Sequence, residues 1–255
     1  MQDETLAGRH ALITGGGTGI GLAIARALAG AGAQVTITGR RHEVLEEAAA
    51  TATGLHALAM DVADENSLRQ GVETAIAARG PVTLCIPNAG IAEGKALHKM
   101  DLAFWRRMMA INLDGAMLTV QACLPGMQAE GWGRVIFVSS IAGLKGLRGA
   151  PAYSASKHGM IGLMRGLSED FLGSGLTFNA LCPGYVDTEI VTRNTESIAA
   201  RAGISQDQAR EIMVKTNRHR RLIHPDEVAA AAMWLCLPGS ESINGQCIEI
   251  AGGQM

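Results

Sequence analysis

A tyrosine and a lysine stand four residues apart in Tyr153-Ser154-Ala155-Ser156-Lys157, at the predicted start of a helix. This spacing places the phenol and the ammonium on one face of the helix. A neighbouring cation favours the phenolate, so we expect Lys157 to lower the pKa of Tyr153. Such a tyrosine can give a proton to a carbonyl oxygen or take one from an alcohol. Chance often produces this pair, so the surrounding residues decide its interpretation.

Two further polar positions precede the pair. Ser139-Ser140 closes the apolar run 135–138, and Ser140 stands thirteen residues before Tyr153. A hydroxyl at the carboxyl end of a central strand can hydrogen-bond the same substrate oxygen. Asn112 is an amide inside an otherwise apolar helical pattern. A satisfied buried amide would explain Asn112, and that interpretation is compatible with a function.

A glycine-rich loop lies between the first predicted strand and the first predicted helix, with the sequence Thr14-Gly15-Gly16-Gly17-Thr18-Gly19-Ile20-Gly21. Gly15 permits the turn after the strand, Gly19 lets the backbone approach a pyrophosphate, and Gly21 allows close packing of the helix on the sheet. The amides and the positive dipole end of the helix hold the phosphates. No Gly-Lys-Ser/Thr follows, so the loop is not a P-loop. We expect a dinucleotide site that also involves Thr18 and Ile20.

The end of the second predicted strand indicates which dinucleotide binds. An NAD site usually has an acid here to bind the ribose 2′-hydroxyl, whereas this sequence has Gly39-Arg40-Arg41. Guanidinium groups suit a 2′-phosphate because they offer charge and a planar set of donors. Alternatively, Arg40 and Arg41 merely open a solvated helix, but their position after the glycine loop favours a binding role. We expect NADP (NADPH) as the cofactor, with NAD as the alternative.

Short apolar runs and longer helical patterns alternate along the chain and would position these residues. Strands are predicted at 10–14, 35–38, 56–60, 82–86, 135–139, 177–181 and 246–250, and helices at 20–31, 44–51, 67–78, 102–129, 155–172 and 226–237. Several strands are almost wholly apolar, which is typical of strands covered on both faces. The alternation requires parallel strands and right-handed crossovers. We predict an α/β fold, a doubly wound parallel sheet (Rossmann fold) with three α/β/α layers, in a single domain over residues 1–255.

Residues 187–224 interrupt this rhythm with a long polar stretch that has helical patches and no strand. A long insertion at the carboxyl edge of such a sheet usually covers a ligand site, which predicts a lid over the substrate. An ordinary surface helix pair is the alternative.

The composition argues against several other classes of protein. Lys and Arg total 22 against 24 Asp and Glu, giving a net charge of −2, so nothing favours nucleic acid or a membrane surface. The five cysteines are scattered without metal-ligand spacing, which predicts no metal site and a reducing compartment. No apolar run reaches the roughly 18 residues of a membrane span, and the N-terminus does not resemble a signal peptide. We expect a cytoplasmic enzyme with a small-molecule substrate.

Along essentially the whole chain, and in the same order, these motifs resemble those of the classical short-chain dehydrogenase/reductase family. The glycine loop resembles its cofactor loop, and Asn112, Ser140, Tyr153 and Lys157 match its catalytic tetrad. Asp61-Val62 matches the pair that contacts adenine, and Asn88-Ala89-Gly90 matches the turn beside the adenosine ribose. The segment that holds the nicotinamide carboxamide is matched by Pro183-Gly184, Val186 and Thr188. One position departs from the family: where it often has an asparagine, this chain has Pro87, which lacks a backbone donor.

The resemblance implies a role for each residue of the tetrad. Tyr153 would be the general acid/base, and Ser140 would polarise the carbonyl. Lys157 would bind the nicotinamide ribose, lower the pKa of Tyr153 and join a proton relay through water held near Asn112. The hydride would pass directly between nicotinamide and substrate, so no metal is needed.

The resemblance also implies an activity and an assembly. The layout resembles 3-oxoacyl-thioester and polyketide ketoreductases and broad ketone reductases, which interconvert a ketone and a secondary alcohol. The implied assembly is a homotetramer, packed through helices around 102–129 and 155–172. Two alternatives stay open: an NAD-linked hydroxyl dehydrogenase working in the oxidative direction, and a dinucleotide sensor without turnover.

A basic group lies outside these motifs and comprises Arg218, His219, Arg220, Arg221 and His224, with Lys145 and Arg148 elsewhere in the chain. These charges could meet an anionic substrate such as a coenzyme A or carrier-protein thioester. A solvated face or salt bridges between subunits is the commoner fate of such charges.

Overall fold

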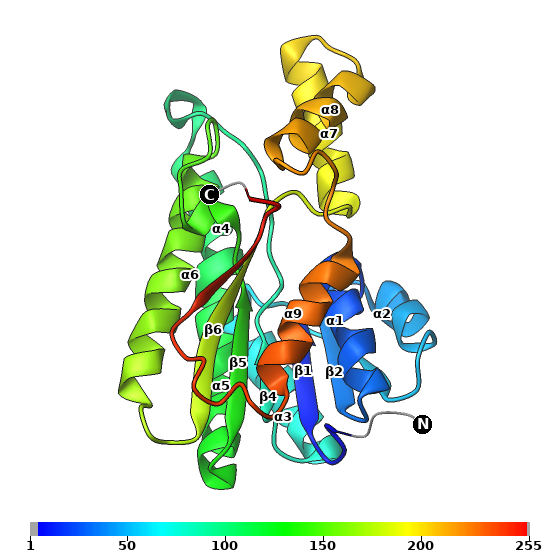
Figure 1. Cartoon of the computed structure of the whole chain (residues 1–255), viewed down its shortest axis with the longest axis vertical. Coiled ribbons are helices and arrows are strands. Elements are labelled where there is room, and N and C mark those ends of the chain that lie inside the picture. Colours follow the sequence, from blue (N-terminus) through cyan, green and yellow to red (C-terminus); the bar gives the residue numbers. More distant parts are fainter. Residues whose placement is uncertain (1–4, 254–255) are drawn as a thin grey trace.

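In the computed structural model, seven parallel strands form one sheet in the order β3-β2-β1-β4-β5-β6-β7 (Figure 1). The strands are β1 (His10–Thr14), β2 (Gln34–Gly39), β3 (Leu55–Ala59), β4 (Leu84–Ile86), β5 (Gly133–Val138), β6 (Leu176–Pro183) and β7 (Cys247–Ile250). The structure describes residues 5–253, except for the side chains at positions 193, 194, 197, 198 and 200–202. Strand order reverses between β1 and β4, which is where an open α/β sheet places its ligand crevice. The predicted doubly wound Rossmann fold is confirmed.

Helices cover both faces of the sheet. They are α1 (Gly19–Gly30), α2 (His42–Ala49), α3 (Glu65–Arg79), α4 (Leu102–Met109), α5 (Gly115–Glu130), α6 (Pro151–Asp170), α7 (Glu189–Ala202), α8 (Gln206–Thr216) and α9 (Pro225–Cys236). Residues of α1, α2 and α9 share one apolar core with one face of the sheet, and α3, α5 and α6 share a second core with the other face. Among the described residues, no helix is long and apolar enough to cross a membrane.

The central strands are apolar because both of their faces are covered. Every residue of β1, β5 and β6 is buried. Successive side chains point to opposite faces, so Ile13 and Ile136 enter the core beneath α1 and α9, whereas Leu12 and Val135 enter the core beneath α3, α5 and α6. This pattern confirms the prediction of buried parallel strands from nearly continuous apolar runs.

The predicted continuous helix over 102–129 is wrong in one respect. A π-helical turn, Ala110–Asp114, separates α4 from α5. A π-turn adds a residue to the helical repeat and often lies at a functional site. Asn112 is in the middle of this turn and is fully buried, so the local geometry of the helix is adapted to this side chain.

The segment 187–224 forms two helices, α7 and α8, and no strand, apart from an isolated bridge between Val186 and Ile223. In Figure 1 the two helices stand above the carboxyl end of the sheet, on the side of α9 and α1. The chain returns from α8 into α9, whose first residue is Pro225 and whose N-cap is His224.

We predict that the start of α1 does not tolerate a side chain at Gly21. A Cβ there would lie 2.4 Å from the Gly15 carbonyl oxygen and 2.5 Å from the Asn88 side-chain nitrogen, both of which are held in place. Gly21→Ala should therefore lower the free energy of unfolding by about 1–3 kcal/mol in urea denaturation.

Gly30→Ala is the matched control, because Gly30 belongs to the same helix and a Cβ there would meet nothing within 4 Å. This change should be neutral or stabilise by up to about 1 kcal/mol. Equal stabilities for the two variants would contradict the close packing of α1 on the glycine loop.

Candidate active site

The glycine loop forms a turn between β1 and α1 whose backbone needs glycine at two places. Gly15 has φ +65° and Gly19 has φ +54°, in the left-handed region that disfavours other residues. The Gly16 amide donates to the Thr38 carbonyl at 3.1 Å, which ties the loop to β2. Thr18 is the N-cap of α1 and its side chain makes no capping bond. The first amides of α1 therefore point into the loop and suit an anion.

Asn88 joins this loop to the end of β4. Its side-chain amide donates to the Thr14 carbonyl at 2.8 Å and to the Gly15 carbonyl at 3.0 Å. The backbone amides of Asn88 and Ala89 both donate to the Thr14 hydroxyl at 3.0 Å. Pro87 has no amide, but its carbonyl accepts from the Val138 amide at 3.0 Å, so β4 still meets β5. The departure at Pro87 thus leaves the strand end intact.

A groove of about 420 Å³ runs along these strand ends. Its lining contains most of the residues predicted to bind the cofactor: Gly15, Thr18, Gly19, Ile20, Arg40, Arg41, Asp61, Val62, Asn88, Ala89, Gly90 and Thr188. Gly21 is outside the lining because its place is beneath the loop, against Gly15. Thr38, Val44, Leu45 and Met60 also line the groove, and the sequence analysis missed them because they are ordinary apolar or strand residues.

The two arginines at the end of β2 have different surroundings. Both are exposed and line the groove. Arg41 pairs at 3.9 Å with Glu189, the first residue of α7, across the groove. The groove therefore has a cationic wall at the end of β2, part of which faces an acid from α7.

Tyr153, Ser140 and Lys157 meet at the carboxyl end of β5. Tyr153 and Lys157 share one face at the start of α6, with the Lys157 Nζ 5.9 Å from the centre of the tyrosine ring. The Tyr153 hydroxyl is hydrogen-bonded to Ser140, which follows β5 and is buried. The Lys157 Nζ donates to the Val138 carbonyl at 2.8 Å. The predicted group of two hydroxyls and an ammonium is thus assembled at one point.

The expected effect of Lys157 on Tyr153 is wrong in this structure. Burial raises the pKa of Tyr153; its hydrogen bond with Ser140 acts in the opposite direction, and the nearby Tyr185 adds to the rise. Burial also lowers the pKa of Lys157 to about 8, so the ammonium loses its proton more readily than that of an ordinary lysine. Desolvation is therefore the largest cause of both pKa shifts. The protein holds Tyr153 as a protonated phenol.

Asn112 is held on every side by hydrogen bonds. Its Oδ1 accepts from the Ile91 amide at 2.8 Å, and its Nδ2 donates to the Ile91 carbonyl at 2.9 Å. The same Nδ2 donates to the Ser156 hydroxyl at 3.0 Å and to the Met108 sulfur at 3.2 Å. Ser156 in turn donates to the Tyr153 carbonyl at 2.8 Å. Asn112 therefore links the loop after β4 to the first turn of α6.

A second hollow, a cavity of about 240 Å³, opens over Tyr153 and Ser140. It is continuous with the groove, because Gly90, Ile91 and Thr188 line both hollows. The predicted nicotinamide segment lies here: Pro183, Gly184, Val186 and Thr188 line the cavity with Lys157. Most other lining residues are apolar, and they come from the loop after β4, the loop before α6, and from α7 and α8.

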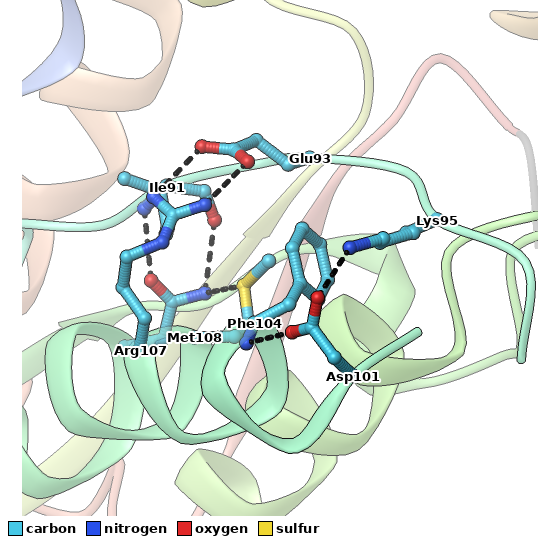
Figure 2. Close-up of polar contacts among 8 residues, drawn as sticks. Ile91, Glu93, Lys95, Asp101, Phe104, Arg107 and Met108 are labelled. Atoms are coloured by element: carbon cyan, nitrogen blue, oxygen red, sulfur yellow. Dashed lines mark hydrogen bonds and ion pairs between the residues drawn. The ribbon is translucent and has the colours of Figure 1, made fainter. Parts of the chain in front are cut away.

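An ion pair in the cavity wall is a feature that the sequence analysis missed. Arg107 of α4 donates to both carboxylate oxygens of Glu93, at 3.0 and 2.6 Å, and Figure 2 shows the two side chains facing each other. Nearby, Lys95 donates to Asp101 at 3.1 Å. These pairs hold the loop after β4 against α4. The acid and the base are fourteen positions apart, so spacing within one helix does not reveal them.

The predicted basic group is divided in the structure. Arg148 lines the cavity, whereas Arg221 pairs with Glu227, His224 caps α9, and none of the described residues 218–224 lines the cavity. No group of three or more His, Cys, Asp or Glu side chains among the described residues could hold a metal ion.

Comparison with known proteins agrees with this geometry. The family model described as short chain dehydrogenase matches residues 9–199. The chain belongs to the short-chain dehydrogenase family. This short-chain dehydrogenase is accordingly an NAD(P)-dependent oxidoreductase that acts on carbonyl or alcohol groups.

Its relatives include enzymes with several substrates. It is 37% identical over 76% of its length to cis-4-hydroxycyclohexanecarboxylate dehydrogenase of Sinomonas cyclohexanicum, covering 74% of that protein. It is 34% identical over 96% of its length to acetoacetyl-CoA reductase of Rhizobium meliloti (strain 1021), covering 98% of that protein. A solved structure of an actinorhodin polyketide ketoreductase variant with NADPH superposes with a TM-score of 0.92, at 30% identity, covering 96% of this chain and 97% of that one.

We predict that Lys157 makes stability depend on pH between about 8 and 10.5. In the folded protein its pKa is about 8, against 10.5 for an ordinary lysine. Between these values the unfolded chain binds more protons, so stability rises with pH. From pH 8 to pH 10.5, the unfolding free energy of wild type should therefore rise by about 3 kcal/mol relative to that of Lys157→Met.

Lys99→Met is the control, because Lys99 is exposed and outside the site. Its difference from wild type should stay constant over the same pH range. A constant difference for Lys157→Met as well would show that burial does not destabilise the ammonium.

Proposed function

We propose that this short-chain dehydrogenase is an NADP-dependent oxidoreductase that reduces a ketone to a secondary alcohol, reversibly. One observation carries the proposal: the Tyr153 and Ser140 hydroxyls and the Lys157 ammonium converge where the cavity joins the groove. A ketone in the cavity would have its oxygen beside both hydroxyls and its carbon facing the groove.

Each group of this site has a defined part in the reaction. Ser140 donates a hydrogen bond that polarises the carbonyl, and Tyr153 gives its proton to the oxygen as negative charge develops there. Lys157 holds a positive charge near the phenol and would bind the nicotinamide-ribose hydroxyls. Asn112 positions α6 through Ser156 and fixes the loop after β4 through Ile91. A bound nicotinamide dinucleotide supplies the hydride, and no metal takes part.

Tyr153 can serve both directions of the reaction, because the phenol gives a proton to a carbonyl oxygen and the phenolate takes one from an alcohol. The relatives bear on the direction: acetoacetyl-CoA reductase supports reduction, whereas D-beta-hydroxybutyrate dehydrogenase keeps an NAD-linked dehydrogenase working oxidatively as the alternative. A sensor without turnover is disfavoured, because it would need no hydroxyls and ammonium assembled at the cavity floor.

NADP is the proposed cofactor. The groove of about 420 Å³ supports a dinucleotide, and the glycines at 15 and 19 let the loop lie close to Ala89 and Thr188, which a Cβ would meet at 3.0 and 3.1 Å. The first amides of α1 would hold the pyrophosphate, Asp61 and Val62 the adenine, and Asn88, Ala89 and Gly90 the ribose. Arg40 and Arg41 would hold the 2′-phosphate. If Arg41 keeps its ion pair with Glu189 when the cofactor binds, only Arg40 contacts the 2′-phosphate. The preference for NADP is then smaller, and NAD is the alternative cofactor.

The substrate class is narrowed by the relatives. They include an acetoacetyl-CoA reductase and a putative ketoacyl reductase of granaticin polyketide synthase, which support a 3-oxoacyl thioester or a related ketone. Ile190 and Val191 of α7 and Met213 of α8 line the cavity, which supports α7 and α8 as a lid over the substrate.

We further propose that each chain forms a single domain and that four chains assemble into a homotetramer. Exposed apolar side chains on α4 and α5, namely Leu102, Trp105 and Met117, support packing of these helices across subunits. All five cysteines are free thiols, which supports a reducing, cytoplasmic location.

Replacing the proton donor tests the reaction. Tyr153→Phe removes one hydroxyl and little binding surface, so the rate of ketone reduction should fall by about 10²–10⁴-fold while NADPH affinity stays nearly unchanged. The rate is followed as NADPH oxidation against a panel of ketones that includes 3-oxoacyl thioesters. A variant that keeps near-normal turnover would rule out Tyr153 as the proton donor.

Exchanging the end of β2 tests the cofactor. Gly39→Asp with Arg40→Leu adds an acceptor for a 2′-hydroxyl and removes a charge-assisted contact to phosphate, worth about 1.5–3 kcal/mol. The ratio of kcat/KM with NADPH to that with NADH should exceed one in wild type and fall at least about tenfold in the double variant. A wild-type enzyme that already prefers NADH would show that these arginines do not read the phosphate.

A further inference from the structure

The substrate cavity has apolar walls but carries charge at three places. The charged residues among its lining are Glu93, Arg148 and Lys157. Lys157 is buried and donates to the Val138 carbonyl at the reaction centre. Glu93 is neutralised by its two hydrogen bonds with Arg107, which also raise the pKa of Arg107 (Figure 2). Of these three charged residues, Arg148 is therefore the one whose side chain is available to a ligand.

Arg148 has no acidic partner among the described residues. Its side chain is exposed at the cavity rim, and no ion pair or hydrogen bond to it is found in the described part of the chain. Three arginines of the neighbouring loops and helices are matched: Arg107 with Glu93, Arg210 with Asp187, and Arg221 with Glu227. An arginine left unmatched beside a cavity is suited to an anionic ligand.

The backbone fixes Arg148 relative to Tyr153. The Ala150 amide donates to the Leu147 carbonyl at 3.2 Å, and Gly149 has φ +76°. These features describe a type II turn with Arg148 at its second position and glycine at its third. The Leu147 amide also donates to the Ser154 hydroxyl at 3.1 Å, which pins the turn to the residue after Tyr153. The turn therefore fixes the backbone of Arg148 close in space to the first turn of α6, and the Arg148 side chain lines the same cavity as Tyr153.

We propose that Arg148 binds the carboxylate of the substrate, and that the substrate is a small oxo acid with an apolar body. This inference rests on the proposed ketone reduction and names its substrate class. A guanidinium offers a planar pair of donors that matches a carboxylate. Ile141, Leu147 and Val186 would contact the apolar part, while the ketone oxygen lies at Tyr153 and Ser140.

The size of the cavity favours a free carboxylate over the phosphate of a thioester carrier. The predicted nicotinamide segment at Pro183 and Gly184 lines the same cavity of about 240 Å³, so a bound nicotinamide would fill part of it and leave space for a short carbon skeleton. Arg148 lines this cavity together with Tyr153, which would let one small molecule present its anion to Arg148 and its ketone to Tyr153. The phosphates of a carrier thioester are separated from the ketone by a long arm and would lie beyond the rim.

The test compares an oxo acid with its methyl ester, which has the same skeleton without the charge. Wild type should have the higher kcat/KM with the acid. Arg148→Gln should lower kcat/KM for the acid by about 10- to 100-fold, mainly through KM, and leave the ester unchanged. Arg148→Lys should recover part of the loss, because it restores charge without the planar pair of donors. Arg218→Gln is the matched control, since Arg218 is exposed but does not line the cavity.

A binding measurement separates this inference from the proposed function. Calorimetry with an unreactive saturated acid of the same skeleton should show tighter binding to wild type than to Arg148→Gln, whether or not turnover is observed. Absence of turnover with every ketone would overturn the proposed function alone. Equal losses for acid and ester, or equal binding of the saturated acid to both proteins, would overturn the role of Arg148. A loss confined to a coenzyme A thioester would overturn the carboxylate as its ligand.

Discussion

Burial of the Lys157 ammonium at the end of β5 is the constraint on which the rest of the site depends. The ammonium donates to the Val138 carbonyl, and burial lowers its pKa to about 8. Gly90 lies close to both polar groups, since a Cβ there would be in tight contact with the Asn112 oxygen at 3.3 Å and in ordinary contact with the Lys157 Nζ at 3.7 Å. The loop after β4, the π-turn and α6 are thus packed around one desolvated cation. Burying a charge is costly, and titratable groups with strongly shifted pKa values are concentrated at functional sites.

The fold supplies this arrangement by ending several parallel strands at one edge. The strand order reverses between the neighbouring strands β1 and β4, and Asn88 joins their ends through hydrogen bonds with Thr14 and Gly15. The resulting groove and cavity share a boundary at Gly90 and Ile91, beside the reacting hydroxyls. Helices α7 and α8 complete the cavity from above, and their position over the edge explains why a long segment without strands is inserted after β6 (Figure 1).

Much of this site could be predicted because its signals are local. The turn at Gly15, the helix start after Thr18 and the shared face of Tyr153 and Lys157 all follow from spacing along the chain. Features set by tertiary contacts could not be predicted: the π-turn at Asn112 depends on Ile91, and the bidentate pair of Glu93 with Arg107 joins a loop to a helix. The pKa of Tyr153 depends mainly on how far the fold desolvates its phenol, and residue spacing does not predict this.

The central claim is that burial keeps Tyr153 protonated, as a donor, in the protein itself. The chain has two tyrosines, so Tyr185→Phe leaves Tyr153 as the sole phenol. The most direct measurement is an NMR titration of this variant with ¹³C-labelled tyrosine, in the absence of added cofactor. Removing Tyr185 takes away the smallest cause of the shift, and burial should still hold the pKa of Tyr153 above the ordinary value of 10.0. A pKa below that value would contradict the claim and show that groups favouring the phenolate, such as Ser140 and Lys157, outweigh desolvation.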